Sequence, residues 1–220
     1  MTAAPELAGL TIAVLGGTGP QGRGLARRFA AAGLSVVLGS RSAERAEETA
    51  AGIGHGVRGA SNADAARAGD VVVVAVPWDG HADLLRELAE ALDGKVVVDC
   101  VNPLGFDKQG AFALPVPEGS AAQQAAELLP GSRVTGAFHH VSAVVLEDPE
   151  VARVDLDVLV VGDDRDATDL VRALADAVPG MRGVFAGRLR NAHQVEALTA
   201  NLISVNRRYK THAGVRVTGV

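Results

Sequence analysis

The chain has 220 residues, of which 48% are hydrophobic and only 3% aromatic, and its formal net charge is −5 at pH 7. This length predicts one large domain, or one domain with a small addition, around an aliphatic core. The charges are mixed along the chain without a basic run, which excludes a nucleic-acid footprint. No cationic segment precedes an apolar stretch at the N-terminus, and the apolar runs are too short to cross a bilayer, so we expect a cytoplasmic protein without membrane partners. The single cysteine, Cys100, excludes an internal disulfide and a CxxC metal site.

Apolar runs alternate with helical patterns through the first half of the chain. The expected strands cover residues 10–15, 36–39, 57–60, 71–76 and 95–99. The expected helices cover residues 21–32, 43–51, 62–67 and 83–92, and Ser42 is placed to cap the second of them. Strands that alternate with helices form parallel βαβ units with right-handed crossovers. The sequence therefore predicts an α/β fold with a Rossmann-type, doubly wound, mostly parallel sheet.

The pattern is looser in the second half. We expect a loop over 105–117, helices over 120–129, 166–177 and 188–209, and strands over 133–138, 157–161 and 214–218. The predicted organisation is a nucleotide-binding Rossmann domain over residues 1–140 and a small C-terminal α/β cap over residues 141–220. The cap is expected to pack on the edge of the sheet and on the carboxyl ends of its strands.

A glycine-rich turn joins the first expected strand to the first expected helix. It has the G-x-G-x-x-G spacing at Gly17, Gly19 and Gly22, with Thr18, Pro20 and Gln21 at the intervening positions. In such a turn the first glycine allows a tight bend, the second lets the backbone approach a pyrophosphate, and the third lets the helix lie close to the strand. The free N–H groups and the helix dipole then attract phosphate. We interpret the turn as a dinucleotide-binding site.

The end of the second strand distinguishes NAD from NADP. An NAD enzyme usually has an acidic residue there that binds the ribose hydroxyls. This chain has Gly39 and Ser40 instead, followed by Arg41, whose guanidinium suits a 2′-phosphate. Arg45, one helical turn further, either closes the far side of the phosphate or pairs with Glu48 on its own helix. The sequence predicts NADP as the nucleotide.

Several motifs together carry a resemblance to a known family. They are Gly16–Ala26, Gly39–Ser42, Val76–Trp78, Val116–Ala122, Gly136–His140, Gly162–Asp164 and Asn206–Gly214. In these motifs the chain resembles the coenzyme F-420-dependent NADP reductases from about residue 10 to its C-terminus. The glycine turn is shared with many dehydrogenases, so the motifs of the second half make the resemblance specific. Residues 99–103 vary in that family, so the resemblance does not define the part of the pocket that they form.

The resemblance implies reversible hydride transfer between NADP and the 8-hydroxy-5-deazaflavin ring of coenzyme F-420. The implied cofactor contacts, beside Gly17 and Gly22, are Thr18, Gly19, Pro20, Gln21, Ser40, Arg41, Arg45, Val76, Trp78, Ala82, Leu104 and Ala143. Of these, Trp78, Ala82, Leu104 and Ala143 are implied to lie along the nicotinamide half of NADP or at its border with the deazaflavin. His139 and Val141 are implied to position the deazaflavin ring. Because the two cofactors supply the reactivity of such a transfer, we expect small apolar walls. The sequence assigns no catalytic acid or base with certainty and no metal ligand.

Three positions near the implied ring site keep two interpretations each. His139 and the adjacent His140 act either as an acid–base group or, the interpretation we favour, as hydrogen-bonded lining. Trp78 either faces the cofactor or packs as a lid over a helix. His81 is expected to be an ordinary residue at a helix N-terminus, and Cys100 a buried thiol.

The last expected helix carries further candidates. His193, Glu196 and Asn201 share a face, which suits either a buried site or the fastening of the cap. The basic residues at 207, 208 and 210 either meet the phosphodiester and glutamate tail of F-420 or are ordinary solvated charges. An apolar stripe at 198, 202 and 205 suits a homodimer or the cap alone.

Two other functions remain open on the sequence. One is an NADPH-dependent reductase of another small substrate or of a flavin, which would need a proton donor that no lysine or tyrosine convincingly supplies. The other is a non-catalytic NADP(H) redox sensor, which would have no space for a second ring beside the nicotinamide. The physiological direction, the stereochemistry of transfer and the length of the deazaflavin tail do not follow from the residues.

Overall fold

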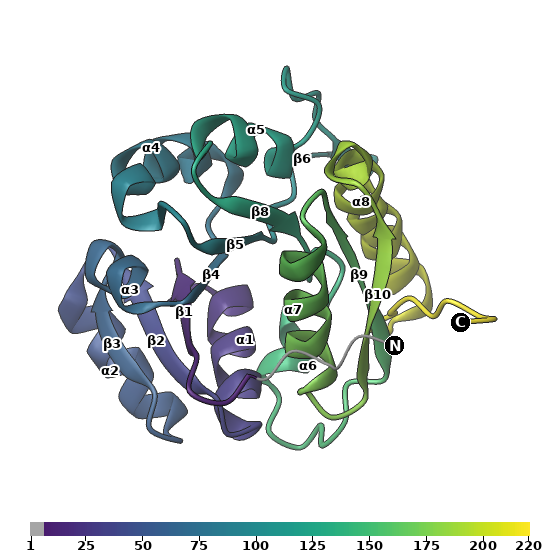
Figure 1. Cartoon of the computed structure of the whole chain (residues 1–220). Helices are drawn as coiled ribbons and strands as arrows, with labels where there is room; N and C mark the ends of the chain where they lie inside the picture. Colours follow the sequence, from purple (N-terminus) through teal and green to yellow (C-terminus); the bar gives the residue numbers. More distant parts are fainter. Residues whose placement is uncertain (1–6) are drawn as a thin grey trace.

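A computed structural model describes residues 7–220, which form an eight-stranded sheet, a separate two-stranded hairpin and helices on both faces of the large sheet (Figure 1). The strands are β1 (Thr11–Leu15), β2 (Ser35–Ser40), β3 (Arg58–Ser61), β4 (Val71–Val74), β5 (Val96–Asp99), β6 (Leu104–Asp107), β7 (Gly110–Ala113), β8 (Arg133–Gly136), β9 (Leu156–Gly162) and β10 (Met181–Gly187). The large sheet has the order β10-β9-β8-β5-β4-β1-β2-β3. All of its neighbouring strands are parallel except the pair β8 and β9.

The helices follow the strands in the order expected for βαβ units. They are α1 (Pro20–Ala31), α2 (Ala43–Ile53), α3 (Asn62–Ala68), α4 (His81–Leu92), α5 (Ala121–Leu128), α6 (Ala143–Glu147), α7 (Arg165–Asp176) and α8 (Ala192–Tyr209), with short 3-10 turns η1 (Trp78–Gly80) and η2 (Leu189–Asn191). Ser42 caps α2 as predicted, since its side chain accepts the N–H of Arg45. No helix within residues 7–220 combines the length and the apolar character that crossing a membrane requires.

The core has two halves, one on each face of the sheet. Alternate residues of β1 point to opposite faces, so Ile12 and Val14 pack with α1, α2, α6 and α7, while Ala13 and Leu15 pack with α3, α4, α5 and α8. The four valines of β4 are buried in the same alternating way because this strand lies in the centre of the sheet. The predicted doubly wound, mostly parallel sheet is confirmed.

Beyond β8 the same sheet continues with two strands that run antiparallel to β8. β9 pairs antiparallel with β8 through Thr135 and Gly162, and β10 pairs parallel with β9. Residues 141–220 therefore add strands to the sheet of the first part and place α8 on the face that α5 also covers. The division of the chain at residue 140 into two domains stays a prediction.

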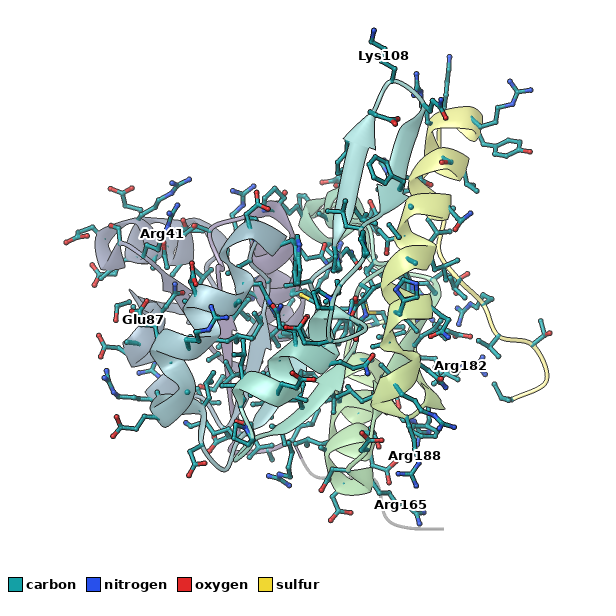
Figure 2. The ribbon with its side chains drawn as sticks, turned by 90° about the horizontal axis from the view of Figure 1, so that it is seen from above. Arg41, Glu87, Lys108, Arg165, Arg182 and Arg188 are labelled. Carbon is teal, nitrogen blue, oxygen red and sulfur yellow. The ribbon has the colours of Figure 1, made fainter. Side chains whose placement is uncertain are left out.

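The prediction of a loop over 105–117 is wrong, because β6 and β7 pair antiparallel as a hairpin. The carboxylate of Asp107 accepts the backbone N–H groups of Gln109 and Gly110, and Gly110 has φ +130°, so the turn is set by local chemistry. The strands contain Gly105, Gly110 and two alanines, which are weak strand formers, and this is why the sequence pattern missed them. Figure 2 shows this hairpin beside α8, with Lys108 at its tip.

Other expectations for the second half also need correction. Residues 214–218 form no strand, although the carbonyl of Val215 accepts the N–H of Asp157 at the start of β9. The strand expected over 133–138 ends at Gly136, since Phe138 has φ +63° and cannot continue an extended chain. Neither α6 nor β10 was predicted from the sequence pattern.

Helix α1 fastens the segment around α6 through one guanidinium. Arg28 donates to the carbonyl oxygens of Val145, Leu146, Asp148 and Val151 at 2.6–2.9 Å. The first three carbonyls belong to the C-terminal end of α6, where a cation is favourable. On the adjacent turn of α1, Arg23 pairs with Glu147 at 2.5 Å. The short helix α6 is therefore held by α1 rather than by its own length.

Replacing Arg28 should show how much this fastening contributes. We expect Arg28→Ala to lower the free energy of unfolding by about 2–4 kcal/mol, because it leaves four carbonyl groups without their charged donor. Urea denaturation followed by circular dichroism measures the change. Arg27→Ala is the matched control, since this neighbouring arginine makes none of these bonds, and a similar loss in both variants would contradict the assignment.

Candidate functional site

A cleft follows the carboxyl ends of the parallel strands β1, β2, β4, β5 and β8, where open α/β sheets bind ligands. It consists of two cavities of about 400 Å³ each. We call them the nucleotide cavity, lined by Gly16, Thr18, Gly19, Ser40, Arg41, Arg45, Asn62, Ala75, Val76, Pro77, Gly80 and Leu84, and the ring cavity. The ring cavity is lined by Gln21, Ala75, Val76, Pro77, Trp78, Cys100, Val101, Asn102, His139, His140, Val141, Ser142, Ala143, Thr199, Leu202, Ile203 and Asn206. The two share the segment 75–77 after β4.

The glycine turn has no space for side chains at two of its positions. A Cβ on Gly17 would lie 2.8 Å from the carbonyl oxygen of Val14, and a Cβ on Gly22 would lie 2.7 Å from the Cα of Gly17. Both contacts are with backbone, which cannot move aside, so α1 approaches β1 as closely as it does only with glycine there. The helix starts at Pro20 after Gly19, and no side chain caps it. Its first-turn N–H groups therefore remain available to a phosphate at the mouth of the cavity.

Two arginines lie at the outer end of the nucleotide cavity, beyond β2. Arg41 and Arg45 are both exposed and both line the cavity (Figure 2 labels Arg41). Neither forms one of the ion pairs found within residues 7–220, and in particular Arg45 is not paired with Glu48. Ser40 lines the cavity beside them and adds no negative charge. This corner presents two positive charges to a ligand.

The inner end of the cleft has a different character. Phe138 is buried with φ +63°, a strained conformation for a side-chain-bearing residue, and its ring packs edge-to-face on Phe29 at 5.7 Å. Its carbonyl accepts the side-chain amide of Gln21 at 3.1 Å, which ties the residue to the glycine turn. The bend at Phe138 turns the chain so that His139 lines the ring cavity.

His139 is buried and both of its ring nitrogens are without a hydrogen-bond partner within the described residues. Burial lowers its pKa to about 4, so the imidazole is neutral at pH 7. Unpaired buried polar atoms are costly, and neither ring nitrogen of His139 is accessible from the cavity that the residue lines. His140 is also neutral, with its pKa lowered to about 4 by burial, and its Nε2 accepts the N–H of Leu159. The two rings thus differ: that of His140 binds β9 through Nε2, whereas that of His139 has no partner within the described residues.

Sequence reasoning missed the contribution of α8 to the ring cavity. Thr199, Leu202, Ile203 and Asn206 line it at the spacing of one helix face. Thr199 donates through its hydroxyl to the carbonyl of His139 at 3.1 Å, and Asn102 donates to the same oxygen at 2.8 Å. The sequence pattern placed the C-terminal cap over the carboxyl ends of the strands, but it did not single out these four residues of α8 as cavity lining.

The cleft brings together most of the implied contact residues. Thr18, Gly19, Ser40, Arg41 and Arg45 line the nucleotide cavity, Gln21, Trp78, Ala143, His139 and Val141 line the ring cavity, and Val76 lines both. Gly17, Pro20 and Gly22 shape the turn without lining either cavity. Ala82 on α4 and Leu104 at the start of β6 lie outside both linings.

The remaining candidates are occupied by contacts within the protein. The Cys100 thiol is buried, donates to the carbonyl of Val74 at 3.0 Å and has a pKa raised by burial, which makes it a poor nucleophile. Glu196 is buried and accepts the N–H groups of Ala121 and Ala122, whereas His193 and Asn201 are exposed, so the three do not form one site. Within residues 7–220 no cluster of three or more His, Cys, Asp or Glu suits a metal ion.

Comparison with known proteins decides the family. Residues 11–103 match the family described as "NADP oxidoreductase coenzyme F420-dependent". The "F420-dependent NADP reductase" of Methanothermobacter marburgensis is 39% identical over 223 residues, which cover 96% of this chain and 99% of that protein. The chain belongs to the coenzyme F-420-dependent NADP reductase family. The "F420-dependent NADP reductase" of Methanocaldococcus jannaschii is 38% identical over 96% of this chain and 99% of its own.

A solved structure supports the same family membership. The crystal structure of a putative F-420-dependent NADP reductase from Arthrobacter sp. FB24 superposes with a TM-score of 0.80 at 27% identity, and covers 96% of this chain and 100% of that one. The resemblance stated from the motifs is thereby confirmed. It extends over the second half of this family member, including α8 and the ring cavity.

The two buried histidines should make this F-420-dependent NADP reductase family member less stable in acid. Their folded pKa of about 4 lies below the unfolded value of about 6.5, so the unfolded chain binds more protons between these pH values. Stability is then full above about pH 6.5 and is lost as the pH falls towards 4. We expect the wild type to lose roughly 1 kcal/mol more per pH unit than His140→Gln between pH 6 and 5.

Chemical denaturation of both proteins across this pH range tests the prediction. Glu196 has a pKa raised to about 7, so its contribution has the opposite sign, but it is common to both proteins and cancels in the difference. Parallel pH profiles for the wild type and the His140→Gln variant would show that His140 does not titrate as described.

Proposed function

We propose that this chain catalyses reversible hydride transfer between NADP(H) and coenzyme F-420. In one direction NADPH, a proton and oxidised F-420 give NADP⁺ and reduced F-420. The observation that carries the proposal is the joined pair of cavities. A dinucleotide with its adenosine phosphate at Arg41 and its phosphates at the α1 N-terminus has its nicotinamide at the shared segment 75–77, next to a second cavity lined by planar and apolar side chains.

The residues present fit both groups. The glycine turn, which admits no Cβ at Gly17 or Gly22, and the unpaired charges of Arg41 and Arg45 suit the pyrophosphate and the 2′-phosphate of NADP. His139, Val141 and Trp78 line the ring cavity and suit the flat deazaflavin ring, with Val141 and Trp78 supplying apolar contact. The two bound rings supply the hydride chemistry, and the protein orients them and excludes water.

The two rival functions fit the cleft less well. A redox sensor that reads only NADP(H) has no use for a second cavity with an unsatisfied imidazole beside the nicotinamide. A reductase of imines or ketones usually supplies a proton to its substrate. The described residues that line the ring cavity include no lysine, tyrosine or carboxylate, and burial keeps both of its histidines neutral at pH 7.

A further cavity suits the tail of F-420, which carries a phosphodiester and glutamates. This tail groove of about 530 Å³ lies between the β6–β7 hairpin and the last turns of α8, and shares Ile203 with the ring cavity. Arg207 and Arg208 line it from α8. The carboxylate of Asp107, also in the lining, is already bound to two backbone N–H groups of its own turn. A polyanionic tail that leaves the ring cavity past Ile203 thus meets two guanidinium groups.

The chain also suits a homodimer formed through α8. Leu198 and Val205 are only half-buried and Tyr209 is 72% exposed, although the spacing places all three on one helix face. A second copy of the chain covers such a stripe with the same stripe about a two-fold axis. Light scattering during gel filtration measures the mass in solution, and a monomer at micromolar concentration would contradict the dimer.

The first test of the function is the loss of the visible absorbance of oxidised F-420 on mixing with NADPH. We expect rapid bleaching with NADPH and little with NADH. Arg41→Ala should raise the KM for NADPH about 10–100-fold, which corresponds to roughly 1.4–3 kcal/mol of charge-assisted binding, and should leave the KM for NADH unchanged. Arg58→Ala on β3 is the control. Tight NADPH binding without bleaching in either direction would refute the F-420 assignment.

The tail groove makes a separate prediction. Replacing Arg207 and Arg208 by Ala should raise the KM for F-420 about tenfold, because each exposed guanidinium contributes modestly to binding a phosphate or carboxylate. The KM for 8-hydroxy-5-deazariboflavin, which has the same ring without phosphate or glutamate, should stay unchanged. Arg190→Ala at the other end of the helix region is the control. Equal effects on both deazaflavins would place the tail elsewhere.

A further inference from the structure

A buried polar chain lies directly beneath the wall of the ring cavity. His81, the first residue of α4, and Asp99, the last residue of β5, are both fully buried, and His81 Nε2 lies 2.5 Å from Asp99 Oδ2. The other ring nitrogen of His81, Nδ1, lies 3.0 Å from Oε1 of Gln124. Gln124 in turn donates through Nε2 to Glu118 at 3.2 Å, which fixes the orientation of its amide. His81 therefore lies between two acceptors, the arrangement of an imidazole that donates from both nitrogens.

Both members of the pair contact residues of the ring cavity. The second oxygen of Asp99 accepts the backbone N–H of Val101 at 3.0 Å, and Val101 lines the cavity. The ring of His81 lies under the indole of Trp78, with the ring centroids 5.5 Å apart and the planes tilted by 32°. A cation at this distance from an indole is attracted to its π-system. Trp78 is half-buried and lines the cavity from the other side.

We propose that His81 and Asp99 form a charged positioning pair that fixes the indole of Trp78 and the backbone of Val101 on the wall of the ring cavity. One side chain thus holds the segment after β4 and the other holds the segment after β5. The two segments come from adjacent parallel strands and meet at the position assigned to the reacting rings. Only this last point rests on the proposed function, because the pair and its contacts do not depend on which ligand binds.

The surroundings favour the charged form of the pair. Besides Asp99, the carboxylate of Glu196 on α8 acts on His81, and Gln124, which accepts from His81, is itself hydrogen-bonded to Glu118. Asp79 and Asp83 lie nearby on the segment of His81 itself, and His139, which also senses Asp99, is neutral. Burial by itself would lower the pKa of His81, but the nearby carboxylate of Asp99 and the hydrogen bonds raise it above its ordinary value.

The chain offers a direct reporter for this pair, since Trp78 is its only tryptophan. A protonated imidazole quenches a neighbouring indole more strongly than a neutral one. We expect the tryptophan emission of the ligand-free wild type to rise in one step as the pH increases, with a midpoint above about 6.5. Asp99→Asn should move this midpoint down by one pH unit or more, and His81→Gln should abolish the step. His140→Gln is the control and should keep it.

Kinetics provide the second measurement. The His81→Gln variant keeps one hydrogen bond but carries no charge. We expect its kcat for F-420 reduction to fall about 10–100-fold. Its KM for NADPH should change less than twofold, because the distant phosphate contacts determine that constant. An emission step that persists in His81→Gln, or a wild-type midpoint at or below 6.5, overturns the proposal. The emission titration uses no ligand, so it stands even if F-420 proves not to be the substrate. If the variants fail to fold, a wild-type midpoint at or below 6.5 still overturns the proposal.

Discussion

The close approach of α1 to β1 is the constraint on which the rest of the structure depends. Without side chains at Gly17 and Gly22, the helix starts directly at the carboxyl end of β1 and presents its N–H groups there. The same helix also binds the segments that follow β8. Arg28 binds the carbonyls around α6, and Gln21 binds the carbonyl of Phe138. One helix thus fixes the phosphate site and the position of the segment that carries His139.

The cleft is electrostatically divided along its length. At its outer end, exposed guanidinium groups lie in water, where a phosphate can displace solvent at little cost. At its inner end, burial keeps His139 and His140 neutral, and the other lining residues are apolar or polar without charge. In the binding mode that we propose, a charged nucleotide is anchored at a distance from the place where the rings meet. This separation lets binding affinity and ring geometry be set by different residues.

At the inner end, hydrogen bonds from polar groups hold the backbone that forms the ring cavity. Thr199 and Asn102 both donate to the carbonyl of His139, and Asp99 holds the N–H of Val101. These contacts satisfy the backbone of two loops, one after β8 and one after β5, that would otherwise leave unpaired groups beside the cavity. The precision of the cavity comes from these backbone contacts rather than from the apolar residues that face it.

The sequence by itself determined the parts of the molecule whose physical cause is local. Four consecutive valines predict a buried central strand, the glycine spacing predicts a tight strand–helix turn, and Arg41 after Gly39 and Ser40 predicts a phosphate corner, because each depends on neighbouring residues only. Tertiary structure decided what depends on contacts between distant residues. Thr199 meets Asn102 across 97 positions, and His81 meets Asp99 only when two βα units pack side by side. The β6–β7 hairpin was hidden for a different reason: its glycines and alanines carry no strand signal, and a turn at Asp107 rather than side-chain burial brings its strands together.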